Sequence, residues 1–204
     1  KDLLVRIFIL YSVLSFIIFL LLNTSEVRMF NSLNLSMSLV STGGFIPTNS
    51  LDKIISSNPQ KLIFIFSLLI SMLNFFLIIN FFEKKIIMKE HKEDLYLVIS
   101  SIVFILFVYF NNFDGLDIIT GVLSSLSNSG LSLFKPDNNL SLYFLLLTII
   151  GGSLISNSSG VKLIRIYILL KTASFEIIKL ISPNSVINKN IYYSDKKITD
   201  DNVR

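Results

Sequence analysis

Two short polar turns interrupt an otherwise strongly apolar chain. The first reads S-T-G-G-F at 41–45, and the second reads S-N-S-G-L at 127–131, so that Gly130 follows Gly44 by 86 residues. Glycine adopts backbone conformations closed to other residues, so carbonyl oxygens in such turns can point toward one axis. Carbonyl oxygens replace the water around a cation without adding a fixed charge. The two turns therefore fit cation coordination, with these candidate residues: Ser41, Thr42, Gly43, Gly44, Ser127, Asn128, Ser129 and Gly130.

A third polar stretch, G-G-S-L-I-S-N-S-S-G, occupies residues 151–160. Its three glycines and five Ser or Asn residues argue against an uninterrupted helix. Non-helical backbone at membrane depth is tolerated only where protein or a water-filled cavity covers it. The stretch is therefore predicted to line a cavity, with these candidate residues: Gly151, Gly152, Ser156, Asn157, Ser158 and Gly160.

The segments around these polar stretches have the composition of a membrane protein. The chain has 204 residues, of which 52% are hydrophobic and 16% are charged. A helix needs roughly 20 apolar residues to cross a bilayer. Apolar windows of about this length cover 3–22, 62–82 and 95–113, and a shorter one covers 140–150. The prediction is an all-α integral membrane protein.

Each polar turn follows a short apolar run, 27–40 or 116–126, that is too short to cross the membrane. The order of span, short helix, polar turn and span thus occurs twice, in units 1–93 and 94–181, before a tail at 182–204. A short helix directs the partial negative charge of its C-terminus toward a cation in the turn. The repetition favours a pore over chance turns between helices.

The basic residues predict the orientation. Lys84, Lys85, Lys89 and Lys92 fall in one loop, and the end of the second unit carries Lys162, Arg165, Lys171 and Lys179. Basic residues concentrate on the cytoplasmic side. Both polar turns are therefore predicted outside the cell.

Several other classes of function are disfavoured. The chain has no cysteine and one histidine, which argues against a transition-metal site. Its basic residues form no arm with interleaved aromatics, so nucleic acid is not expected as a partner. The membrane segments contain no paired carboxylates and no nucleophile with a base, and 151–160 lacks the lysine and spacing of a phosphate-binding loop. An enzyme is not expected.

The turn S-T-G-G-F and the pattern from Gly151-Gly152 to Val161-Lys162-Leu163-Ile164-Arg165 resemble the membrane subunit of the TrkH/KtrB family of bacterial potassium transporters. That family has four tandem pore repeats of the potassium-channel-like type, and this chain resembles the second (1–93) and third (94–181). The tail 182–204 resembles the cytoplasmic linker before the fourth. In the family's pattern, Ile155 and Ser159 stand where glycines are usual.

The resemblance implies uptake of potassium across the bacterial cytoplasmic (inner) membrane by a multi-pass protein. The carbonyls of the two turns would form two walls of a single-glycine selectivity filter, with K+ as the transported ion. Segment 151–160, with Lys162 and Arg165, would be a gate loop below it. Expected partners are the lipid bilayer, the missing first and fourth repeats, and a second copy of the full-length protein. A further expected partner is a cytoplasmic regulatory subunit of the TrkA/KtrA type, which would carry NAD or ATP; no cofactor is expected in this chain.

Two alternatives remain open. The chain could be a non-conducting membrane scaffold or a degenerate paralogue of the same fold, given Ile155, Ser159 and the divergent second turn. Lys162 and Arg165, three apart on one predicted helical face, could serve the gate or simply mark the cytoplasmic end of the membrane.

Overall fold

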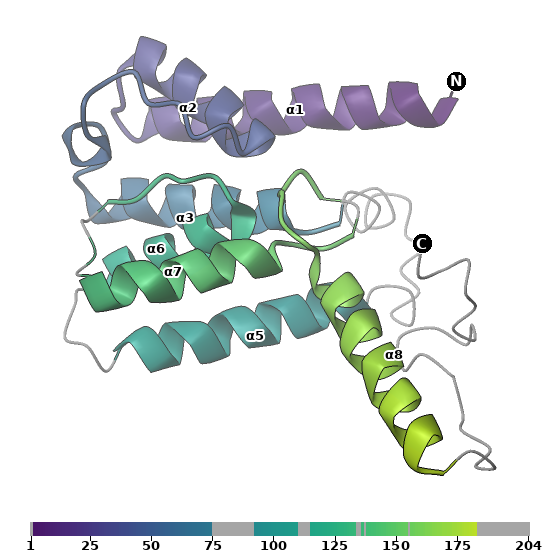
Figure 1. Cartoon of the computed structure of the whole chain (residues 1–204). Coiled ribbons are helices and arrows are strands. Elements are labelled where there is room, and N and C mark those ends of the chain that lie inside the picture. The colour runs from purple at the N-terminus through teal and green to yellow at the C-terminus, as the bar shows by residue number, and fades with distance from the viewer. Residues whose placement is uncertain are drawn as a thin grey trace.

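The structure is a computed structural model that describes residues 2–74, 92–109, 115–133, 136, 138–154 and 156–182. All regular structure in these residues is helical, as predicted (Figure 1). The helices are α1 (Asp2–Thr24), α2 (Met29–Ser41), α3 (Asn58–Met72), α5 (Lys92–Tyr109), α6 (Gly115–Ser127), α7 (Asn138–Ile150) and α8 (Leu163–Ile181), with a 3₁₀ turn at Leu51–Lys53. The predicted short helices 27–40 and 116–126 correspond to α2 and α6.

Helix α6 lies at the centre of the helix packing and contacts α3, α5 and α7. Its buried residues include Ile118, Val122 and Leu123. They belong to the same core cluster as a stripe on α3 spaced four residues apart, formed by Phe64, Leu68 and Met72, all fully buried. Helices α1, α2 and α3 contact one another in a second group. Both short helices are thus held by longer neighbours.

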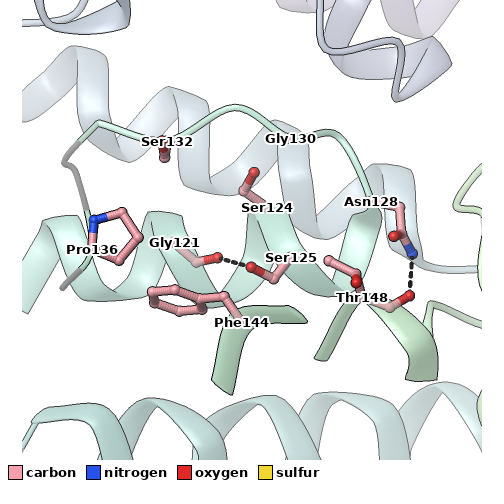
Figure 2. Close-up of a pocket in the computed structure, with 9 residues that line it drawn as sticks. All are labelled: Gly121, Ser124, Ser125, Asn128, Gly130, Ser132, Pro136, Phe144 and Thr148. Atoms are coloured by element: carbon pink, nitrogen blue, oxygen red, sulfur yellow. Dashed lines mark hydrogen bonds between the residues drawn. The ribbon is translucent and has the colours of Figure 1, made fainter. Parts of the chain in front are cut away.

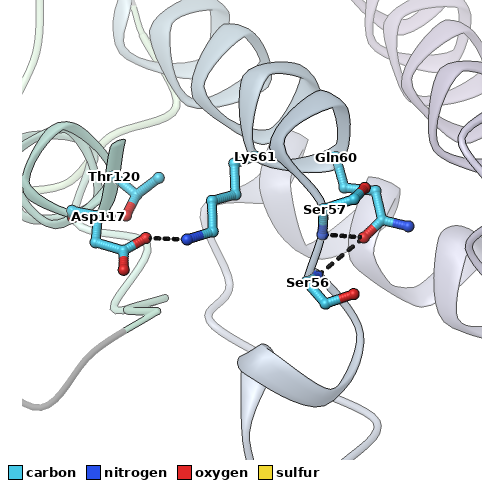
Figure 3. A network of polar contacts seen from close by, with 6 residues as sticks. All are labelled: Ser56, Ser57, Gln60, Lys61, Asp117 and Thr120. Carbon is cyan, nitrogen blue, oxygen red and sulfur yellow. Dashed lines mark hydrogen bonds and ion pairs between the residues drawn. The ribbon is translucent and has the colours of Figure 1, made fainter. Parts of the chain in front are cut away.

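The start of α3 is fixed by one glutamine. The Oε1 of Gln60 accepts hydrogen bonds from the backbone N–H groups of Ser56 and Ser57, at 2.9 and 3.1 Å (Figure 3). Its Nε2 donates to the carbonyl of Ser25 at 2.9 Å, in the connection between α1 and α2. These bonds satisfy N–H groups that a helix start otherwise leaves unpaired.

The end of α3 corrects one prediction. The window 62–82 was expected to form one span, but the helix ends at Met72. The Met72 carbonyl accepts a hydrogen bond from Ser153 N at 3.0 Å, and Asn74 N donates to Asp94 Oδ1 at 3.0 Å. Partners distant in sequence therefore replace the hydrogen bonds that would continue the helix.

Among the described residues, one helix is long and apolar enough to cross a membrane, at Leu4–Thr24. Only 11% of its most apolar window is buried within the chain. Its exposed side chains include Leu4, Phe8 and Phe16. Shorter apolar helices cover Asn58–Met72, Gly115–Ser127 and Leu140–Ile150.

Some predicted features fall outside the described residues. They are the loop with Lys84, Lys85 and Lys89, the parts of two windows at 75–82 and 110–113, Ile155, and the linker from residue 183 onward. The division into units 1–93 and 94–181 stays a prediction.

Candidate functional site: two turns and the segment between α7 and α8

Helices α2 and α6 end in the same way. The N–H of Thr42 donates to Leu39 O at 3.3 Å, and that of Gly43 donates to Ser38 O at 2.9 Å. In the second turn, Asn128 N donates to Ser125 O at 3.2 Å, and Ser129 N donates to Ser124 O at 3.1 Å. Both pairs follow the hydrogen-bond pattern of a Schellman motif. The two turns thus share their local structure as well as their sequence.

The sign of φ also follows the same order in both turns. Thr42 (φ 52°) and Gly44 (φ 71°) are left-handed, as are Asn128 (φ 58°) and Gly130 (φ 67°). The residues between them, Gly43 and Ser129, are not. A non-glycine residue in this region costs of order 1–3 kcal/mol unless its surroundings hold it there. Thr42 is β-branched, so its backbone is more strained than that of Asn128, the other non-glycine residue with positive φ in these turns.

The two turns lie against each other. A Cβ at Gly44 would lie 2.5 Å from the carbonyl oxygen of Ser129, closer than such atoms approach. A Cβ at Gly130 would instead meet no other atom within 4 Å. Contact between the turns therefore needs glycine at position 44 for both its φ and its close approach.

Hydroxyl groups support the second turn from within. The Oγ of Ser129 lies 3.1 Å from Ser124 Oγ and 3.2 Å from Ser127 Oγ, which also donates to Ser124 O at 3.2 Å. In the first turn Ser41 Oγ donates to Ser38 O at 3.4 Å. Neither set includes an ionised group, so the turns offer oxygens without fixed charge.

The described residues of segment 151–160, which are all but Ile155, form a loop whose ends meet. Gly151 has φ 67°, and a Cβ there would overlap the carbonyl oxygen of Ser159 and lie 3.1 Å from the Cα of Gly160. Val161 N donates to Ile149 O at 2.9 Å across the same point. Within the loop, Gly152 N donates to Ser158 Oγ at 2.9 Å. The predicted break between two helices is confirmed, since α7 ends at Ile150 and α8 begins at Leu163.

This loop is hydrogen-bonded to both turns. The Asn157 side-chain amide donates to Val40 O, and Thr42 Oγ1 lies within hydrogen-bond distance of Asn157 O at 3.2 Å. The Asn128 side-chain amide donates to Ser159 O at 3.2 Å and to Thr148 O at 3.0 Å. Residues that the sequence placed in a filter and a gate are therefore brought together.

The prediction that Lys162 and Arg165 share a helical face is wrong. Lys162 precedes α8 with φ 65°, whereas Arg165 lies in the first turn of α8 and its N–H donates to Lys162 O at 3.1 Å. The Lys162 ammonium folds back onto the loop, where it contacts Ser156 O at 3.4 Å, Ser156 Oγ at 3.3 Å, Ser158 Oγ at 3.2 Å, and Ser158 O. The left-handed backbone at Lys162 prevents the helix from starting earlier.

Sequence reasoning missed the carboxylate that holds this loop from outside. Glu93, in the first turn of α5, accepts a hydrogen bond from Leu154 N at 3.0 Å. Glu93 belongs to no motif. The only signal in the sequence is a charged residue just before the apolar window 95–113.

A cavity of about 400 Å³, whose surface is more apolar than polar, borders the second turn. Figure 2 shows that α6, the turn and α7 supply its lining, which is Gly121, Ser124, Ser125, Asn128, Gly130, Ser132, Pro136, Phe144 and Thr148. Its lining thus combines serine and threonine hydroxyls and one amide with apolar surface. The second turn therefore contacts the first turn through Ser129 and borders a cavity at Gly130.

An ion pair joins the starts of α3 and α6. Lys61 Nζ lies 2.6 Å from Asp117 Oδ1, with side chains 18% and 19% exposed (Figure 3). Because α6 carries the second turn at its other end, the pair helps to fix where that turn lies. Among the described residues, no group of three or more His, Cys, Asp or Glu could hold a metal ion.

Known proteins similar to this chain include one of solved structure and one related in sequence. The structure is similar to that of the potassium transporter TrkH from Vibrio parahaemolyticus, with a TM-score of 0.78 and 20% sequence identity over 92% of this chain and 44% of that one. The sequence is 27% identical over 188 residues to an uncharacterised cation transporter of Methanocaldococcus jannaschii, covering 89% of this chain and 38% of the relative. No family model matches the chain. The chain therefore shares the fold of the matched part of TrkH, and it spans less than half the length of each of these two proteins.

Proposed function

We propose that this chain forms two walls of a gated cation pathway in a bacterial cytoplasmic membrane. The observation that carries the proposal is the contact between the two turns, where Gly44 meets Ser129, with a loop hydrogen-bonded to both. The turns offer carbonyl and hydroxyl oxygens and no fixed charge, which suits an ion that must bind and leave. The fold of a potassium transporter and a cation transporter relative support the same function.

The transported ion in this proposal is K+, held by carbonyls of 42–44 and 128–130 with one left-handed glycine in each wall, Gly44 or Gly130. The turns lie outside the cell. Segment 151–160 obstructs the pathway below them until it moves. The basis for a mobile obstruction is that hydrogen bonds of side chains and backbone, rather than apolar packing, connect the loop to the turns.

Two walls do not enclose a pathway. We propose that further repeats of the same kind, the first and fourth of the family's pattern, complete it. The open space at Gly130 and the cavity behind the second turn leave room for a neighbour on that side. A second copy of the whole protein and a cytoplasmic regulatory subunit of the TrkA/KtrA type, carrying NAD or ATP, belong to the same proposal.

The test is rubidium uptake by cells that lack their own potassium uptake. The protein is expressed with whatever flanking sequence its gene encodes, as wild type and as Gly44→Ser. Gly115→Ser is the matched control, because a Cβ at Gly115 would make only an ordinary contact of 3.8 Å with Tyr109. Wild type and Gly115→Ser are expected to take up rubidium, and Gly44→Ser to lose it. Equal uptake by all three would refute the filter assignment.

A second candidate function is a non-conducting scaffold. The observation that favours it is Asn128, whose amide ties the second turn to Ser159 and Thr148. Such bonds would also suit a pathway that is permanently closed. A membrane-inserted wild type that takes up no rubidium, with or without a regulatory partner, would support the scaffold.

A further inference from the structure

Glu93 is a buried carboxylate outside both turns and the loop. Its side chain lies in the first turn of α5 and the residue is 8% exposed. Burying a carboxylate is costly unless hydrogen bonds or an opposite charge compensate. Its Oε1 accepts the Leu154 N–H at 3.0 Å, from a residue 61 positions away. The cost of burial is thus offset by a bond to segment 151–160.

The neighbouring residues place the start of α5 beside the loop. Asp94, 3% exposed, accepts the Asn74 N–H at 3.0 Å. Ser153, adjacent to Leu154, donates its N–H to Met72 O at 3.0 Å. The end of α3, the start of α5 and residues 153–154 therefore meet at one point.

The loop is also held by its own cation, which lies close enough to Glu93 for the two charges to interact. Lys162 Nζ contacts oxygens of Ser156 and Ser158. These contacts lie within the loop and its flank, so they would move with it. The Leu154–Glu93 bond instead joins the loop to a different helix and must break if this part of the loop moves away from α5.

We propose that Glu93 is a positioning residue that latches segment 151–160 in its obstructing position, and that loss of the Glu93–Leu154 hydrogen bond is a step of opening. The proposal rests on the proposed function of the loop as a gate. A hydrogen bond to a charged group is strong enough to shift a closed-to-open equilibrium about tenfold or more. The bond is made by Leu154, whereas the bonds between the loop and the two turns are made at Asn157 and Ser159.

The test measures the position of the loop without transport. The chain has no cysteine, and Ser153 beside Leu154 is fully buried. Ser153→Cys in the full protein, with any flanking cysteines replaced, therefore reports exposure of the loop through its rate of reaction with a water-soluble thiol reagent. In this background Glu93→Ala is expected to react about tenfold faster. Glu93→Gln keeps an acceptor oxygen at the same reach but loses the charge, so its rate is expected to lie between those of the parent and Glu93→Ala.

Glu93→Asp separates loss of the hydrogen bond from a folding defect. It keeps the buried charge but shortens the side chain by one methylene. Its expected rate is several-fold above the parent. Glu176→Gln, on the exposed face of α8, is the control and leaves the rate unchanged. The latch is overturned if Glu93→Ala and Glu93→Asp react at the parent rate, or if Glu93→Gln reacts as fast as Glu93→Ala.

Rubidium flux in liposomes separates this proposal from the proposed function. With the latch lost, Glu93→Ala is expected to raise basal flux in the absence of a regulatory partner, whereas a folding defect would lower it. A protein that conducts nothing but shows the expected order of labelling rates would refute the transport function and keep the latch. Conduction with unchanged labelling rates would refute the latch alone.

Discussion

At the scale of single residues, the two left-handed glycines have different surroundings. Both have positive φ, but only Gly44 lies against backbone, at Ser129. Gly130 borders a cavity of about 400 Å³. The same substitution therefore tests close approach at one position and backbone conformation at the other.

Gly44→Ala is expected to destabilise the protein by more than about 3 kcal/mol, because the new Cβ adds a backbone clash to the strain of a positive φ. Gly130→Ala adds only the conformational cost, about 1–2 kcal/mol. Thermal unfolding in detergent checks the order of the two midpoints. Equal midpoints would mean that the turns do not touch at Gly44.

At the scale of elements, the sequence predicted the helices and breaks that depend on a local pattern of residues. Helices α2 and α6 follow from half-length apolar runs that end in polar turns, and the break after α7 follows from the glycines and serines of 151–160. The early end of α3 depends on Ser153, some eighty residues further along, and the backbone of Lys162 depends on the closure of a loop. The bond from Glu93 to Leu154 is missed for the same reason. Long-range contacts are not visible in a hydropathy window.

The loop's bonds to the first turn predict a gain of function. Asn157→Ala removes the amide that donates to Val40 O. One neutral hydrogen bond contributes about 0.5–1.5 kcal/mol, so rubidium uptake by the full protein is expected to rise roughly two- to tenfold. Ser174→Ala, which loses only a bond to the Leu170 carbonyl on exposed α8, serves as the control. Lower uptake by Asn157→Ala would mean that the bond supports the pathway rather than its closure.

The Lys61–Asp117 pair predicts a partial rescue. Lys61→Asp or Asp117→Lys alone places like charges together near the starts of α3 and α6, and each is expected to reduce uptake. The double exchange restores opposite charges at the same position. Uptake and thermal midpoint are therefore expected to recover partly in the double variant. No recovery would indicate that the pair does not position α6.

At the scale of the whole molecule, the exposed apolar side chains of α1, α5 and α7 require an apolar surrounding or further protein. The proposed membrane orientation places 45–57 outside and α8 inside. Single cysteines at Ser56 and Lys171 in the full protein test it. Ser56→Cys is expected to react with an impermeant thiol reagent on intact cells, and Lys171→Cys only after permeabilisation. The reverse pattern would invert the orientation.

The central claim is that the two turns line a cation pathway, and ion selectivity tests it most directly. Gly130→Ser is the informative variant, because open space at this position allows the protein to fold. The measurement is the ratio of rubidium to sodium uptake by the purified full-length protein in liposomes. The account predicts a high ratio for wild type and at least a tenfold lower ratio for Gly130→Ser. A wild type that moves neither ion, or an unchanged ratio in Gly130→Ser, would contradict it.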